Sequence, residues 1–113
     1  MISLEEVLLL HDSLRDCGLL KFDGINNLTL LKSAIDGQYW FNTPFDALCH
    51  VSFSVNAYHC FRDGNKRTAS LIILSSGLSF NIPVLTDVIL SVADGRIKDK
   101  QDFIQKVYSC IIT

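Results

Sequence analysis

A nine-residue stretch near the middle of the chain carries the side chains most capable of chemistry. It reads His59-Cys60-Phe61-Arg62-Asp63-Gly64-Asn65-Lys66-Arg67. Histidine titrates near neutral pH, so His59 could take a proton from an attacking hydroxyl group. Asp63 offers a carboxylate of the kind that holds Mg²⁺ beside phosphate oxygens, and Lys66 and Arg67 offer positive charge to those phosphates. The residue types therefore suggest a nucleotide-phosphate site with a metal carboxylate and a general base.

The segments around this stretch would strengthen such a site. Apolar segments precede and follow it, and the second predicts a helix that begins near Asn65. The first N–H groups of a helix lack intrahelical partners, and with the helix dipole they form an anion site. Gly64 permits a backbone nest and the close approach of a phosphate. Lys66 and Arg67 oppose the dipole unless an anion compensates them, a local conflict that is typical of functional sites.

Each of these residues also has a purely structural explanation. His59 could be a histidine at a helix C-terminus, favoured there by the dipole. Asp63 and Gly64 could form a plain turn in which Asp63 or Asn65 caps the next helix. The cations at positions 66 and 67 could simply be solvated. None of these explanations accounts for all the residues falling within nine positions, between the two most apolar segments of the chain.

Capping residues and hydrophobic spacing predict about six helices. The predicted helices begin near Ser3, Leu28, Thr43, Asn65, Thr86 and Asp99. Ser3 with Glu6 forms a capping box, and Thr43 is followed by Pro44 at the first helical position. Residues expected to end helices are Gly18, Gly37, His59, Ser79 and Gly95. Between the fourth and fifth helices, residues 81–84 are expected to be extended, because Pro83 biases Ile82 towards β or polyproline geometry.

The third and fourth predicted helices are apolar on most sides, so we expect them to lie at the centre of an all-α bundle. The chain of 113 residues has room for one domain, residues 1–113. Its net charge of −2 disfavours a nucleic-acid surface. The uncharged run 68–86 contains too many serines, with Asn81 and Pro83, for a membrane span. Acidic residues at positions 5 and 6 disfavour a signal peptide.

The four cysteines are expected to be reduced thiols in a cytoplasmic protein, buried as small apolar residues. They are Cys17, Cys49, Cys60 and Cys110. None forms a C-x-x-C pair, and no histidine lies at zinc-ligand spacing from two of them.

The stretch from His59 to Arg67 resembles the signature of the Fic/Doc family. Fic proteins carry H-P-F-x-[DE]-G-N-G-R-x-x-R, and the Doc toxins carry H-x-F-x-D-[AG]-N-K-R, which this chain matches at every specified position. The sequences around His11, Gly24 and residues 93–97 also look like Doc. The resemblance implies a Fic/Doc-type helical bundle with the catalytic loop between its two central helices.

The resemblance also implies roles for individual residues. His59 would activate the target hydroxyl, and Phe61 would anchor the loop in the core. Asp63 would hold Mg²⁺, while Gly64 and Asn65 would form the anion hole. Lys66 and Arg67 would add positive charge around the phosphates of ATP, with Arg67 holding the nucleotide.

Two departures from the Fic pattern are shared with Doc. Lys66 replaces the second glycine, where a side chain would crowd the phosphates in AMP transfer, and Ser70 replaces the last arginine. Doc-like proteins bind ATP in the reversed sense and transfer its γ-phosphate to a threonine of elongation factor Tu, which stops translation. The resemblance therefore implies a protein kinase toxin. An AMP transferase and a catalytically inactive partner-binding relative remain alternatives.

The resemblance further implies control by a partner. Fic proteins often carry an inhibitory [ST]-x-x-x-E-[GN] motif, but the only glutamates, Glu5 and Glu6, do not occur in one. We therefore expect a Phd-like antitoxin in trans, whose disordered C-terminal segment folds into a groove on the toxin. The aromatic run 39–41 is a candidate for partner contact or for satellite core packing. His11 is either a second polar group near the site or a surface residue, and His50 is expected to be a satisfied core histidine.

Overall fold

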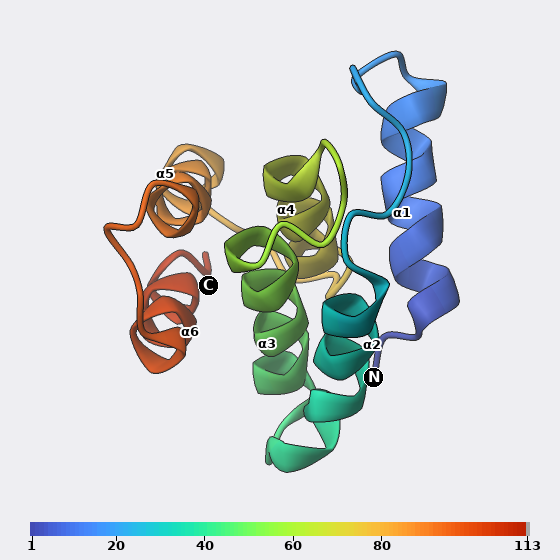
Figure 1. Ribbon diagram of the computed structural model, residues 1–113. Helices are drawn as coiled ribbons and strands as arrows, with labels where there is room; N and C mark the ends of the chain where they lie inside the picture. Colours follow the sequence, from blue (N-terminus) through green and yellow to red (C-terminus); the bar gives the residue numbers. More distant parts are fainter. Residues whose placement is uncertain (113) are drawn as a thin grey trace.

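The computed structural model describes residues 1–112 and is built from helices (Figure 1). The helices are α1 (Leu4–Asp16), α2 (Leu28–Asp36), the 3₁₀ helix η1 (Gly37–Trp40), α3 (Pro44–Ala57), α4 (Asn65–Leu74), α5 (Ile82–Ala93) and α6 (Lys100–Ser109). Within those residues, β pairing is limited to two isolated bridges, Ile25 with Phe61 and Phe80 with Ile111. The all-α prediction with about six helices is confirmed.

Side chains cap the start of five of the six α-helices in the part of the chain that the structure describes. The capping residues are Ser3, Asn27, Thr43, Asn81 and Asp99. The predicted capping box of α1 is present, with Glu6 returning a hydrogen bond to the backbone of Ser3. Helix α4 is the exception, because its N-cap is Gly64, which has no side chain to offer. This uncapped start lies in the stretch singled out by the sequence.

Two predicted helix limits are wrong. Helix α4 ends at Leu74 rather than near Ser79, because the chain turns at Ser75 and Ser76 and Gly77 adopts a left-handed φ of 79°. Helix α5 begins at Ile82 rather than after Thr86. Asn81 caps it and Pro83 lies in its first turn, where a missing N–H costs nothing, so residues 82–84 are helical rather than extended.

Helix α2 ends at Asp36 with Gly37 as its C-cap, as predicted, although Gly37 is right-handed (φ −65°) and the chain continues directly into η1. A Cβ on Gly37 would lie 2.5 Å from Nε2 of His50, so a glycine is also needed here for close approach. Gln38 is buried and joins the backbone of Ile2 through both its amide atoms. η1 is therefore held firmly against α3 and the N-terminal segment.

The core is divided into two hydrophobic clusters by α3, which supplies buried residues to both. One cluster joins α3 to α4, α5 and α6 around Phe53, Ile73 and Phe103. The other joins α3 to α1, α2 and α4 around Val55, Leu31 and Ile72. Figure 1 shows α3 and α4 between α1 and α2 on one side and α5 and α6 on the other. The prediction that these two helices are central is confirmed.

His50 is buried in α3, but it is not the satisfied core histidine that we predicted. Neither of its ring nitrogens has a hydrogen-bond partner among residues 1–112. Burial, aided by the positive charge of Lys100, lowers the pKa of His50 to about 4. The ring stacks instead on Phe41, with 4.9 Å between ring centroids. His50 is therefore a neutral packing residue at neutral pH.

The cysteines are all free thiols, as predicted. Cys49, Cys60 and Cys110 are buried, whereas Cys17 is exposed at the end of α1, contrary to the prediction that all would be buried. Burial raises the pKa of Cys49 to about 12 and that of Cys60 to about 11, so both are inert thiols. Among the described helices, none has the length and apolar character needed to cross a membrane.

Candidate active site

His59 stands in a strained backbone conformation at the end of α3. Its φ of 47° makes it the one non-glycine residue with positive φ in the described chain. Two hydrogen bonds hold this positive-φ conformation. The N–H of Cys60 donates to the carbonyl of Val55, and the Asn26 side chain donates to the carbonyl of His59. Strain of this kind persists only where the surroundings impose it and is concentrated at functional sites. The side chain of His59 is exposed.

The loop after His59 is fixed by the segment that follows α1. The N–H groups of Asn26 and Asn27 both donate to the carbonyl of Cys60, and the N–H of Arg62 donates to the carbonyl of Gly24. Phe61 is buried between these contacts, with 1% of its surface exposed. The expectation that Phe61 anchors the loop in the core agrees with this packing.

His11 supports the same loop from α1. It is buried, its ring is parallel to that of Phe61 at a centroid distance of 3.8 Å, and its Nε2 lies 2.9 Å from the carbonyl oxygen of Asp63. Of the two roles considered for His11, the structure selects the polar group near the site and excludes the surface residue. His11 touches the loop backbone rather than the cavity, so it is a positioning residue.

Asn65 braces the loop with its side chain. Its Oδ1 accepts from the N–H of Phe61 and its Nδ2 donates to the carbonyl of Phe61, each at 2.9 Å. The side chain therefore braces the loop, and one N–H of Nδ2 remains beyond these two hydrogen bonds. Asn65 can also offer an anion its backbone N–H at the start of α4.

The carboxylate of Asp63 ties two loops together. Oδ2 accepts from the N–H of Lys21 at 2.6 Å, and Oδ1 accepts from the N–H of Gly64 at 2.8 Å. The hydrogen bond from Lys21, with further ones from Gly64 and Phe22, holds the pKa of Asp63 below its usual value. The group is thus an ionised carboxylate at neutral pH. These three hydrogen bonds leave one of the four lone-pair positions of the carboxylate free, so Asp63 could give one ligand to a cation that takes its other ligands from phosphate and water.

Position 64 requires a glycine, both because of its backbone conformation and because neighbouring side chains leave no room for a Cβ. Its φ is 81°, and a Cβ there would lie 2.6 Å from Cδ2 of Leu20 and 3.2 Å from Cδ1 of Leu14. The first helical hydrogen bond runs from Thr68 to the carbonyl of Gly64, so the N–H groups of residues 65–67 precede the helical ladder. Those groups give the start of α4 its positive end.

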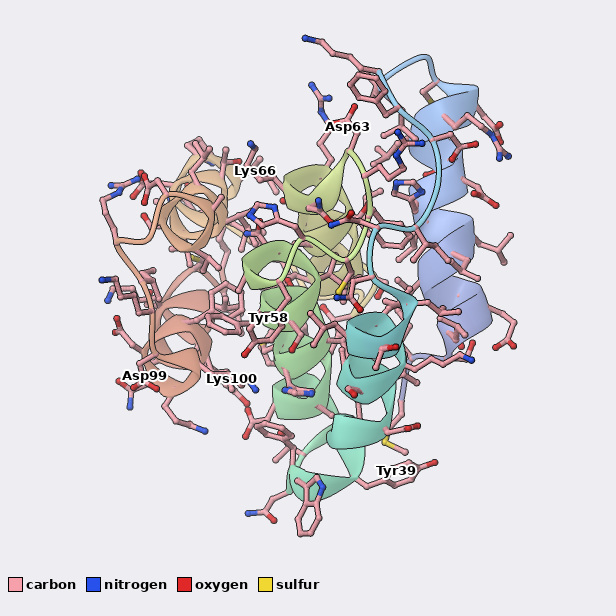
Figure 2. All side chains as sticks on the ribbon, in the orientation of Figure 1. Tyr39, Tyr58, Asp63, Lys66, Asp99 and Lys100 are labelled. Carbon is pink, nitrogen blue, oxygen red and sulfur yellow. The ribbon has the colours of Figure 1, made fainter. Side chains whose placement is uncertain are left out.

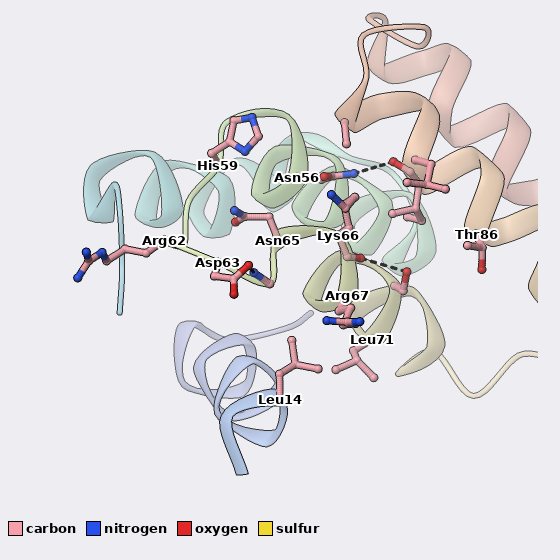
Figure 3. A pocket seen from close by; sticks show the side chains of 15 residues that line it. Leu14, Asn56, His59, Arg62, Asp63, Asn65, Lys66, Arg67, Leu71 and Thr86 are labelled. Carbon is pink, nitrogen blue, oxygen red and sulfur yellow. Dashed lines mark hydrogen bonds between the residues drawn. The ribbon is translucent and has the colours of Figure 1, made fainter. Parts of the chain in front are cut away.

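All the predicted site residues meet around one cavity of about 800 Å³ (Figure 3). The residues that line it are Leu14, Asn56, His59, Arg62, Asp63, Gly64, Asn65, Lys66, Arg67, Ser70, Leu71, Thr86, Ile89, Leu90 and Ala93. Asp63 is the one carboxylate in this lining, beside three cations. The volume falls within the range of small-molecule sites. The cavity thus combines positive charge, one carboxylate and an exposed histidine.

A comparison with protein-family models matches residues 2–75 to the Fic/DOC family. The chain belongs to the Fic/DOC family. Members of this family are transferases that move AMP or a phosphoryl group. No curated protein matches the chain. The region matched to the Fic/DOC family extends over α1 to α4 and contains the whole loop from His59 to Arg67, whereas α5 and α6 lie beyond it.

Two polar cavity residues in this Fic/DOC chain, Asn56 and Thr86, were not predicted from the sequence, and neither were the apolar ones. Asn56, almost fully buried on α3, donates from Nδ2 to the carbonyl of Ile89 on α5 at 2.9 Å, and Thr86 comes from α5 itself. A signal for Asn56 exists in the sequence, because it is a large polar residue three positions before His59 in a segment of mostly small and apolar residues. Thr86 gives no such signal, because its position in the sequence predicts a helix cap.

The aromatic run 39–41 lies away from the cavity. Figure 2 shows Tyr39 at the end of the molecule opposite Asp63 and Lys66. Tyr39 and Trp40 are 77% and 89% exposed, so satellite core packing is wrong for both. Of the three, Phe41 alone packs inward, against His50 and the hydrophobic cluster that joins α3 to α4, α5 and α6.

Proposed function

We propose that this protein is a Doc-like toxin, an Mg-ATP-dependent protein kinase that phosphorylates a threonine of elongation factor Tu and so blocks translation. The observation that carries the proposal is the cavity where His59, Asp63, Lys66 and Arg67 meet the uncapped start of α4. A triphosphate needs a concentrated positive field, and two of the three cations in this cavity, Lys66 and Arg67, stand beside free helical N–H groups.

The reaction is the transfer of the γ-phosphoryl group to a hydroxyl. His59 accepts the proton of the threonine hydroxyl while its oxygen bonds to the γ-phosphorus, and the bond from that phosphorus to the β,γ-bridging oxygen breaks to release ADP. Lys66, Arg67 and the N–H groups of α4 hold the phosphate oxygens and stabilise the charge that develops on them. Asp63 would hold Mg²⁺, which when bound supplies further charge neutralisation at the phosphates.

The side chain of Lys66 favours γ-phosphoryl transfer over AMP transfer. The second glycine of the Fic pattern leaves room for phosphates that a lysine would crowd, and Ser70 stands where Fic proteins place their last arginine. Here Ser70 lines the cavity with its hydroxyl bonded to the carbonyl of Lys66, so it adds no charge. These two differences are the reason to place AMP transfer second.

The location of the protein and the partner that restrains it follow from the same proposed activity. The target is a translation factor, so we place the protein in the cytoplasm, bound neither to nucleic acid nor to a membrane. A Phd-like antitoxin in trans would restrain this protein, because neither of the protein's glutamates, Glu5 and Glu6 in the first turn of α1, occurs in the inhibitory motif. The antitoxin's disordered segment would fold on a groove of the toxin.

The decisive experiment uses ATP labelled at the α- or the γ-phosphate, with elongation factor Tu and Mg²⁺. Label transferred from the γ-position alone supports the kinase. Label from the α-position overturns it in favour of AMP transfer, and no label from either points to the inactive binding relative. His59→Ala should abolish transfer with the fold intact, because the side chain is exposed. Lys98→Ala, an exposed change outside the cavity, is the matched control.

A further inference from the structure

A second, smaller cavity of about 330 Å³ adjoins the first at His59. Its lining residues are Phe22, Asn26, His59, Phe61, Arg62 and Asn65. His59, Arg62 and Asn65 line both cavities, so His59 stands where the two spaces meet. The segment after α1 contributes Phe22 and Asn26 to the smaller cavity, and the other four lining residues come from the stretch from His59 to Arg67.

Arg62 gives the smaller cavity a positive charge without a counter-charge. Its guanidinium carbon lies 5.8 Å from the centroid of the exposed Phe22 ring, a cation–π contact that positions it. Within residues 1–112 Arg62 forms no salt bridge, and no carboxylate lines this cavity. Figure 3 shows Arg62 extending away from Lys66 and Thr86, on the far side of Asp63. The larger cavity already has Lys66, Arg67 and the start of α4 for phosphates.

Asn26 adds an acceptor to the same wall. Its Nδ2 donates to the carbonyl of His59 at 2.9 Å, which fixes the orientation of the amide and leaves Oδ1 to face other donors. An exposed acceptor beside an exposed guanidinium suits a peptide segment, whose backbone offers N–H groups and whose side chains offer carboxylates. A phosphate ester offers no such donor to Oδ1.

We infer that the smaller cavity receives the acceptor segment of the protein substrate, and that Arg62 selects a segment with an acidic residue beside the hydroxyl. The inference rests on the proposed function, since the occupant is the segment whose hydroxyl must reach His59. Donor and acceptor then approach His59 from adjoining cavities, the nucleotide from the larger and the peptide from the smaller. The residue type at position 62 therefore determines which charge this protein prefers beside the target hydroxyl of its substrate.

The test compares binding of three fluorescent peptides that differ only beside a central threonine, where they carry Asp, Ala or Lys. Binding is measured by anisotropy without nucleotide, so it does not depend on any transfer. The wild-type protein should bind the Asp peptide about fivefold more tightly than the Lys peptide, as expected for a partly exposed charge pair, and less so at high salt. Equal binding of the Asp and Lys peptides, or no binding of the Asp peptide, overturns the inference.

Arg62→Glu should invert the preference, and Arg62→Ala should abolish it. Lys98→Glu makes the same type of charge change on an exposed residue outside both cavities and should leave the preference intact. An equal effect of Lys98→Glu would show only a long-range field and would refute the role of Arg62. If Arg62→Glu weakens ATP binding but leaves the peptide preference unchanged, Arg62 belongs to the nucleotide site and the inference is wrong. Peptide discrimination without label transfer would instead refute the proposed kinase alone.

Discussion

The ring of His11 lies almost parallel to the ring of Phe61, at an interplanar angle of 9°, and its Nε2 reaches the carbonyl oxygen of Asp63 at 2.9 Å. Because a carbonyl only accepts, Nε2 carries the proton of this hydrogen bond. One side chain of α1 therefore supports both the anchor of the loop and the backbone of its carboxylate residue. The position of Asp63 in the cavity depends on a contact from another helix.

His11→Ala should destabilise the protein by about 2–4 kcal/mol, because it removes a buried stack and a hydrogen bond and leaves a void beneath Phe61. His11→Phe keeps the stack and should cost only about 1–2 kcal/mol, since only the Asp63 carbonyl is left unpaired. Urea denaturation measures both. Equal stability losses for the two variants would contradict the assigned role of the ring stack.

The helix limits that could be predicted from the sequence are those set by residues close together in the chain. Ser3, Thr43 and Asp99 could be assigned as caps because a cap is made within one helical turn, and all three are confirmed. The start of α5 was missed because a proline is compatible both with an extended strand and with a first helical turn, and tertiary packing chooses between them. Gly37 was correctly assigned as the end of α2, but its close approach to His50 could not be predicted, because His50 lies thirteen positions away.

The candidate site shows the same division. The residues from His59 to Arg67 form a contiguous stretch, so their grouping around one cavity needed no tertiary information. His11 and Asn26 reach the loop only because α1 and the segment after it fold against α3, which no local pattern reveals. The bracing role of Asn65 was also hidden, since a capping residue and a residue that grips Phe61 look alike in sequence.

Gly64→Ala should destabilise the protein by about 2–4 kcal/mol. The new Cβ combines the cost of a left-handed backbone, about 1 kcal/mol, with overlap against Leu20 and Leu14. Gly77→Ala is the matched control, because its φ of 79° is almost the same and nothing lies within 4 Å of its Cβ position. The control should lose only about 1 kcal/mol in thermal or urea unfolding. Similar losses at both positions would show that packing at Gly64 is unimportant.

His59→Gly should be more stable than His59→Ala by about 1 kcal/mol, because glycine adopts the left-handed conformation at position 59 without strain. Both variants should lack transfer activity if His59 is the base. Urea midpoints for the two variants, with the label-transfer assay, check the prediction. A His59→Gly protein less stable than His59→Ala would mean that the strain is relieved in some other way.

The stability of the fold should fall as the pH drops from about 6.5 to about 4. The pKa of His50 lies near 4 in the folded protein, below its ordinary value of 6.5, because burial disfavours the charged ring. The unfolded chain therefore binds the proton first in that window, so protonation favours unfolding as the pH falls. At about 1.4 kcal/mol per pKa unit, and with some water reaching the charged ring, the loss is about 2 kcal/mol.

His50→Leu isolates this contribution, because it keeps an apolar side chain between Gly37 and Phe41 and removes the titrating group. The free energy of unfolding, measured by urea titration at pH values from 4 to 7, should fall with decreasing pH by about 2 kcal/mol less in the variant than in the wild type. The remaining slope would come from carboxylates such as Asp63, whose pKa is held low in the folded state by the N–H of Lys21. Identical slopes for the two proteins would show that His50 is protonated without cost, and that the ring is less enclosed in solution than its packing against Gly37 implies.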